Sequence, residues 1–182
     1  VSDVGGGIYV RSNGTRWLPI NGRAVIKRAP ATEATTTTAA ETDVPNFTLP
    51  LPIGLWQNGD LLRIFGRVLK SGESDTVSLI ARINTGLTAV TGTNAGQITQ
   101  PATTNNDCQF DYWLKRLSAT TIRAFPAGAG LVGTGATVPA TVTVSNMDAN
   151  QLYAHLTCTI AGGGGETVTF ADFTAEWIPC YA

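Results

Sequence analysis

Apolar and polar side chains alternate along most of this chain with a period of two residues. In residues 61–70, Leu62 and Ile64 fall on one face of an extended backbone, and Arg63 and Arg67 fall on the other. Side chains of a β-strand point alternately to the two faces of its sheet, so this pattern predicts strands with one buried face. The same pattern recurs in residues 76–84, 107–117, 151–160 and 166–179. Residues 137–144 predict a further strand, in which Pro139 indicates a sheet edge or the start of the strand.

Clusters of Gly, Pro and Asn separate these segments and predict tight turns. Asn13 and Gly14 lie between two short apolar and aromatic runs, which is a strong hairpin signal because both residue types tolerate positive φ. The Thr-rich residues 31–42 predict an exposed strand or a mobile loop, and residues 146–150 predict one helical turn. Otherwise we expect essentially no helix.

Some eight to ten short strands with Gly-rich turns predict an all-β fold, an antiparallel sandwich or barrel. We expect two parts: an N-terminal hairpin or connector in residues 1–24 and a β-sandwich in residues 25–182. The chain begins at Val1, and we expect residues 1–7 to be the cut end of something longer.

Composition narrows the functional classes. Charged residues make up 14% of the 182 residues, whereas about 25% is typical, and the chain has 27 Thr and 20 Gly. The formal net charge of −1 and the pI of about 5.8 disfavour nucleic-acid binding through a basic face. No apolar run approaches the roughly 20 residues of a membrane-spanning helix, so we expect no membrane insertion.

Catalytic groups are sparse. His155, the single histidine, lies opposite Leu152, Ala154 and Leu156 in the alternation, which predicts an outward-facing surface histidine. No G-x-S-x-G motif accompanies it.

Two carboxylate pairs are candidates for glycoside hydrolysis, which requires carboxyl groups about 5–9.5 Å apart. Asp172 and Glu176 share a strand face, but four strand residues span about 13 Å. Glu73 and Asp75 lie in a predicted hairpin loop, where solvated charges collect. We therefore expect no enzymatic activity.

Metal and cofactor sites are not predicted either. Cys108, Cys158 and Cys180 form no C-x-x-C motif, and we expect them to be reduced and mostly buried, although one disulfide among them is an open alternative. The polar run of residues 105–107 reads as a turn. The Gly-rich residues 128–135 and 162–165 precede no helix, so they also read as turns.

The four tryptophans are the remaining candidates for ligand contact, since aromatic faces stack on the apolar faces of sugars. Trp17, Trp56 and Trp177 fit core or subunit positions. Trp113 is the best candidate for exposure, because its neighbours on the same strand face are Asp111 and Lys115. Trp113 is therefore the candidate binding residue.

Two stretches resemble tailed-bacteriophage virion proteins. The first runs from Asp3-Val4-Gly5 through residues 7–22, and it resembles a hairpin with a D-V-G segment, an aromatic strand, an S/N-x-G-T-R-W turn and a P-x-N/G exit. The second, in residues 48–64, is similar to the T-x-x-x-I-P-x-G-x-x-x-x-N-G-x-L-R-I opening of the β-domain that follows. The resemblance covers the first third of the chain, and the rest agrees only in strand rhythm.

The resemblance implies a jelly-roll-like β-sandwich, usually a homotrimer, in a tail fibre, tailspike or related virion appendage. The family has no catalytic residues to carry over. Our first hypothesis is a tail fibre or receptor-binding domain that contacts other virion proteins and attaches the virion to a host surface receptor or polysaccharide. We expect binding at loop tips, since loops on a rigid sandwich often carry function: residues 86–106, 126–135 and 162–165.

Two alternatives remain open from the sequence. One is a purely structural virion part, such as a capsid decoration, collar or adaptor protein. The other is a virion-associated glycan hydrolase.

Overall fold

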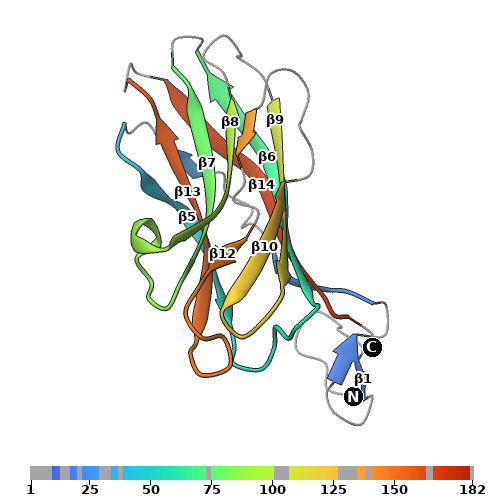
Figure 1. The fold of residues 1–182 in the computed structure, drawn as a ribbon. Helices are drawn as coiled ribbons and strands as arrows, with labels where there is room; N and C mark the ends of the chain where they lie inside the picture. Colours follow the sequence, from blue (N-terminus) through green and yellow to red (C-terminus); the bar gives the residue numbers. More distant parts are fainter. Residues whose placement is uncertain are drawn as a thin grey trace.

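The computed structural model describes residues 10–12, 17–19, 22–28, 34–36, 39–72, 75–100, 107–126, 135–137, 141–162 and 166–180. Two antiparallel sheets pack face to face as a sandwich (Figure 1). The predicted all-β sandwich is therefore confirmed. Within the described ranges, the helical structure is one short 3-10 turn, Ala89–Thr91, and no helix is long and apolar enough to cross a membrane.

The larger sheet contains seven strands in the order β12-β10-β9-β6-β14-β3, with β4 also paired to β14. Its bounds are β3 Ala24–Arg28, β4 Ala34–Thr36, β6 Leu61–Ser71, β9 Asp107–Arg116, β10 Thr121–Pro126, β12 Val142–Thr143 and β14 Thr167–Ile178. The strands β6, β9 and β14 are its long central members, and each has a paired strand on both sides.

The smaller sheet contains five strands in the order β11-β8-β7-β13-β5. Its bounds are β5 Thr42–Leu51, β7 Val77–Asn84, β8 Thr93–Gln100, β11 Gly135–Thr137 and β13 Leu152–Ile160. Among the described strands, the chain changes between these two sheets from β4 to β5, β5 to β6, β6 to β7, β8 to β9, β10 to β11, β11 to β12, β12 to β13 and β13 to β14. Residues distant in sequence therefore become neighbours in each sheet.

Alternation places the core between the sheets as predicted. In β6 the residues Leu62, Ile64 and Val68 are buried, and the strand alternates between buried and more exposed positions along its length. Across the two sheets, Phe47 of β5 packs edge-on against Phe173 of β14, with 4.6 Å between the ring centroids. The Tyr112 hydroxyl also donates a 2.7 Å hydrogen bond to the Leu79 carbonyl.

The predicted N-terminal hairpin forms a separate two-stranded sheet. Strand β1, Val10–Ser12, pairs antiparallel with β2, Trp17–Pro19, and Figure 1 shows this unit outside the sandwich. The turn at Asn13 and Gly14 lies outside the described residues. The division of the chain into residues 1–24 and 25–182 stays a prediction.

One predicted strand is wrong. The apolar pattern of residues 137–144 predicts a single strand, whereas β11 ends at Thr137 and joins the smaller sheet, and β12 begins at Val142 and joins the larger one. The chain thus changes sheets within this short segment, which alternation alone does not reveal. Where a helical turn is predicted, residues 147–149 form a hydrogen-bonded turn, closed by a 3.0 Å bond from the Asn150 amide to the Asn146 carbonyl, and no helix.

Candidate functional site

The outward face of the larger sheet carries a cluster of aromatic and charged side chains on its three central strands. We call it the Trp113 face; its members are Arg63, Phe65, Arg67, Gln109, Asp111, Trp113, Asp172 and Glu176. In each strand these residues alternate with core residues, so packing of the core sets their outward direction. The Trp113 face thus lies on the three central strands, each of which is paired with a strand on both sides.

Strand register aligns the face into rows. Glu176 of β14 lies opposite Arg63 of β6, Arg63 lies opposite Trp113 of β9, and Trp113 lies opposite Phe125 of β10. Directly opposed side chains in an antiparallel sheet have Cβ atoms about 4.5–5.5 Å apart. A second row places Asp172 opposite Arg67, and Arg67 opposite Gln109.

Arg63 is the most constrained member of the face. Its Nε and Nη2 donate hydrogen bonds of 3.0 and 2.7 Å to the two carboxylate oxygens of Asp111. Its Cζ atom also lies 4.1 Å from the ring centroid of Phe65 and 4.8 Å from that of Trp113, within the range of cation–π contact. The hydrogen bonds to Asp111 raise the pKa of Arg63, so the guanidinium stays charged.

Glu176 supports the same guanidinium from β14. Its side chain is 7% exposed, and its oxygens lie 3.7 Å from Nη1 of Arg63 and 3.6 Å from Nη1 of Arg23. Its Oε2 atom has no hydrogen-bond partner among the described residues. This buried carboxylate therefore acts on the face mainly through its charge, beside Arg63.

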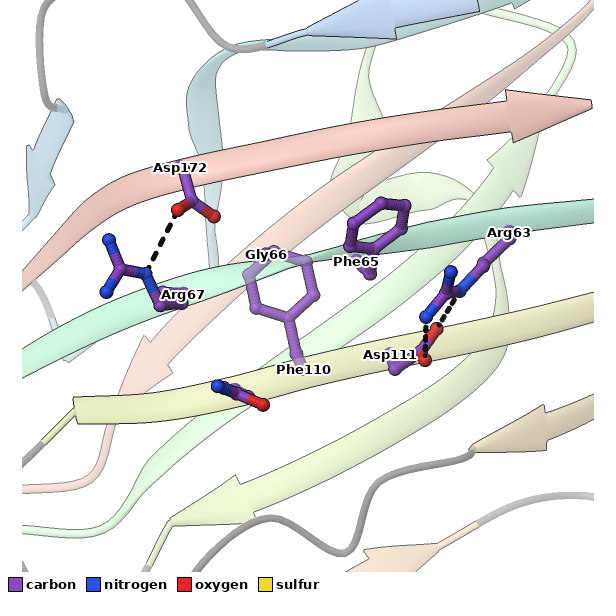
Figure 2. A pocket seen from close by; sticks show the side chains of 8 residues that line it. Arg63, Phe65, Gly66, Arg67, Phe110, Asp111 and Asp172 are labelled. Atoms are coloured by element: carbon purple, nitrogen blue, oxygen red, sulfur yellow. Dashed lines mark hydrogen bonds and ion pairs between the residues drawn. The ribbon is translucent and has the colours of Figure 1, made fainter. Parts of the chain in front are cut away.

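A surface cavity of about 300 Å³ opens beside Arg63. Figure 2 shows the Arg63–Asp111 pair at one end and the Arg67–Asp172 pair at the other, with Phe65 and Phe110 between them. The lining residues are Arg63, Phe65, Gly66, Arg67, Gln109, Phe110, Asp111 and Asp172. The cavity thus combines aromatic surface, two ion pairs and one side-chain amide.

A β-bulge in β14 shapes one wall of this cavity. The pairing of β14 with β6 shifts register between Phe170 and Asp172, so Phe170 points into the core while Asp172 points outward. The bulged backbone approaches β6 so closely that a Cβ at Gly66 would lie 2.1 Å from the Asp172 carbonyl oxygen. Glycine at this position therefore permits the bulge, and the bulge allows Asp172 to meet Arg67.

The described tryptophan side chains differ in solvent exposure, as their sequence neighbours predict. Trp113 is partly exposed on the outward face, whereas Trp56 and Trp177 are buried. Both buried indoles donate hydrogen bonds to Asp60: Trp56 to its carbonyl oxygen at 3.1 Å and Trp177 to its carboxylate at 3.0 Å. The side chain of Trp17 lies outside the described residues. A binding role for Trp113 stays a prediction.

The prediction of a surface His155 is wrong. The ring points away from the sandwich core, as its position in the alternation requires, but it is fully buried. It lies 3.2 Å from the Thr48 hydroxyl of the neighbouring strand β5 and 3.2 Å from the Gly86 carbonyl oxygen. Burial is the main cause that lowers the pKa of His155, against smaller opposite effects of Gly86 and Asp43. Residues that are distant in the sequence therefore bury the ring, and the alternation of side chains along a strand does not predict such contacts.

The carboxylates considered for hydrolysis have separate partners. Asp172 hydrogen-bonds Arg67 at 3.0 Å, whereas Glu176 lies beside Arg23 and Arg63. Glu73 lies outside the described residues. The backbone amide of Asp75 donates a 3.0 Å hydrogen bond to Oε1 of Glu166.

The structure also describes two of the three cysteines. Neither Cys158 nor Cys180 forms a disulfide bond. Cys158 is buried as expected, whereas Cys180 is exposed and departs from the expected burial. The side chain of Cys108 is not among those described. In the described part of the chain, no three His, Cys, Asp or Glu side chains are grouped to hold a metal ion.

The predicted binding loops are described only in part. Residues 86–100 contain the 3-10 turn and β8, and Ala161 and Gly162 lie in a turn, with a φ of +91° at Gly162. Residues 101–106, 127–134 and 163–165 lie outside the described ranges. A binding role for these loops stays a prediction, and the cavity above lies on the sheet face instead.

Sequence reasoning found Trp113 but did not single out Arg63, Phe65, Arg67 or Gln109. Alternation placed each of them on an outward face, which was the available signal. Their convergence depends on the register of β6 against β9 and β14, strands separated by long stretches of sequence.

No protein-family model and no curated protein matches this chain. Among solved structures, the chain is similar to the CBM2 module of the evolved Dit of Lactobacillus casei BL23 phage J-1, with 11% identity over 82% of this chain and 77% of that chain, and a TM-score of 0.40. Winged bean acidic lectin complexed with methyl-α-D-galactose aligns with 10% identity, 80% and 86% coverage, and a TM-score of 0.37. Caenorhabditis elegans galectin LEC-6 aligns with 12% identity, 74% and 94% coverage, and a TM-score of 0.29. With similarities of this size, the function rests on the chain's own residues.

Proposed function

We propose that this chain is a virion protein of a tailed bacteriophage and that its Trp113 face binds a saccharide on the host surface. The observation that carries the binding proposal is the stack of Arg63 between Phe65 and Trp113 beside a cavity lined by two ion pairs and Gln109. The resemblance of residues 3–22 and 48–64 to phage virion proteins supports the biological setting.

Aromatic and polar groups have distinct parts in this binding. The partly exposed Trp113 ring offers an apolar face on which a sugar ring can stack. Carboxylates accept hydrogen bonds, guanidiniums donate them, and the Gln109 amide does both, which suits the hydroxyl groups of a saccharide. Binding needs no bond to break, so we propose a non-catalytic attachment protein.

The tail-fibre position and the homotrimer belong to the same proposal. Light scattering in solution measures the oligomeric state, and a monomer would contradict a fibre. Electron microscopy of the virion with a labelled antibody measures location, for which we expect a tail appendage.

A purely structural virion role is the second candidate. It is favoured by exposed apolar side chains at the margins of the Trp113 face, where Leu69 is 39% and Phe125 is 44% exposed. Apolar surface of this kind also fits contact between virion subunits. A capsid or neck position in the microscopy would support this candidate.

The decisive test is binding of the labelled protein to host cells and to isolated host-surface polysaccharide. We expect Trp113→Ala to weaken binding at least tenfold in a protein that remains folded at the assay temperature, which its melting curve checks. Tyr153→Ala is the matched control, because Tyr153 is a half-buried aromatic residue of the smaller sheet. Equal binding by wild type and Trp113→Ala, or no binding by wild type, would reject the proposal.

A further inference from the structure

We infer that the cavity between Arg63 and Arg67 selects neutral saccharides and discriminates against acidic ones. This inference rests on the proposed function of the Trp113 face and adds the chemical class of the ligand. Its basis is the charge balance of the cavity: the lining contains two guanidiniums and two carboxylates, and each guanidinium is joined to one carboxylate.

The Arg63 end of the cavity is closed to a new anion. Asp111 occupies Nε and Nη2 of the guanidinium, and Glu176 lies 3.7 Å from Nη1. The rings of Phe65 and Trp113 lie near its Cζ. Since contacts surround the group, Arg63 cannot turn toward a ligand carboxylate without losing its bidentate partner.

The Arg67 end of the cavity is open to solvent, but the charge of this guanidinium is also balanced by a carboxylate. Nε of Arg67 donates a 3.0 Å hydrogen bond to Asp172, and their side chains are 49% and 54% exposed. A uronate, sialate or phosphate group entering here would lie near the Asp172 carboxylate, and like charges repel. An uncharged hydroxyl group avoids that repulsion and can accept from Arg67 or donate to Asp172.

The volume fits a small ligand segment. About 300 Å³ lies at the lower end of the range of small-molecule sites, roughly 300–1,000 Å³. The cavity therefore holds a short part of a glycan, and the remaining chain lies over Trp113 and the rest of the face. An uncharged ligand has no net charge for salt to screen, so we expect its binding to depend little on salt concentration.

The test uses immobilised bacterial polysaccharides in chemically matched pairs. Each pair contains a neutral polymer and the same polymer after its primary hydroxyls are oxidised to carboxylates. For wild type we expect at least tenfold stronger binding to the neutral member. We also expect less than a twofold change in that binding between 50 and 500 mM NaCl.

The variant Asp172→Asn removes the carboxylate that pairs with Arg67. We expect it to raise binding to the oxidised polymers at least fivefold, and we expect high salt to abolish this gain. Asp43→Asn makes the same change of charge at an exposed position of the smaller sheet, so it should leave both affinities unchanged. Asp172 is exposed, and the melting temperature checks that the variant is folded.

The outcomes separate the two proposals. Stronger binding of wild type to the oxidised polymers, or no gain for Asp172→Asn, overturns the neutral-ligand inference while saccharide binding stands. Absence of binding to every polymer and to host polysaccharide overturns the proposed function, and the inference with it.

Discussion

The carboxylate of Asp60 accepts a 3.0 Å hydrogen bond from the indole of Trp177, which lies 117 positions later in the chain. The same carboxylate accepts from the Cys180 amide at 2.7 Å and from the Gln57 amide at 3.0 Å. Asp60 is fully buried and lies immediately before β6. One side chain thus fastens the C-terminal end of β14 to the beginning of β6.

Replacing Asp60 should destabilise the whole sandwich. Asp60→Ala removes the acceptor of the buried Trp177 indole and of two part-buried backbone amides. Because a buried unsatisfied group costs about 1–3 kcal/mol, we expect the free energy of unfolding to fall by about 2–3 kcal/mol. Urea denaturation followed by circular dichroism measures this, with the exposed Asp43→Ala as a control expected to change stability by less than about 0.5 kcal/mol.

Gly66 should tolerate no side chain. A Cβ there would lie 2.1 Å from the Asp172 carbonyl oxygen and 2.7 Å from the Phe173 Cα, both backbone atoms. We expect Gly66→Ala to cost roughly 3 kcal/mol of stability and to weaken saccharide binding, because the wall carrying Asp172 must move. Gly86→Ala is the matched control, since nothing lies within 4 Å of its added Cβ. A Gly66→Ala variant with wild-type thermal stability would show that the bulge is not constrained there.

Stability should fall as the pH drops below 6.5 because of His155. Burial lowers the pKa of this ring in the folded protein, whereas the unfolded chain titrates near 6.5. The unfolded state therefore binds the proton first, and the stabilisation present in full above pH 6.5 is lost progressively below it. We expect a lower free energy of unfolding at pH 5.5 than at pH 7.5.

The substitution His155→Gln should flatten this dependence, and His155 is the single histidine of the chain. Glu41 contributes in a different range: burial raises its pKa, but hydrogen bonds from Arg82 and Thr157 outweigh this and hold the pKa below 4.5. Its contribution is lost at more acidic pH. An unchanged slope between pH 5.5 and 7.5 in His155→Gln would mean that other groups cause it.

The two described thiols should differ sharply in reactivity. Burial, and then the nearby charge of Glu41, raise the pKa of Cys158 to about 12, whereas Cys180 is exposed. Since the thiolate is the reacting form, iodoacetamide at pH 8.5 should label Cys180 and leave Cys158 unmodified in the native protein. Peptide mass spectrometry assigns the labelled positions. Rapid native labelling of Cys158 would contradict its burial, and labelling in urea serves as the positive control.

The strands and the core were predictable because their signal is local. Alternation in residues 61–70 placed Leu62 and Ile64 inward and Arg63 outward, and the structure agrees. Phe170 and Trp177 are both buried although they occupy opposite parities in one strand, and the bulge between Phe170 and Asp172 explains this.

The candidate site was predictable only in part because it is built from non-local pairing. Trp113 was identified from its immediate neighbours, but its contact with Arg63 arises from the pairing of β6 with β9. His155 was misplaced for the same reason: Thr48 and Gly86 reach it from 107 and 69 positions away. The alternation in the sequence predicts the sheet face on which a side chain lies. The contacts that it makes there depend on strand register and on the packing of residues distant in the sequence.

The location of the Trp113 face on β6, β9 and β14 has a consequence for how it responds to heat and denaturant. Interior strands of a sheet open only when the cooperative unit around them opens. The face therefore has no hinge of its own, and ligand capture should persist up to the unfolding midpoint and vanish in that same transition.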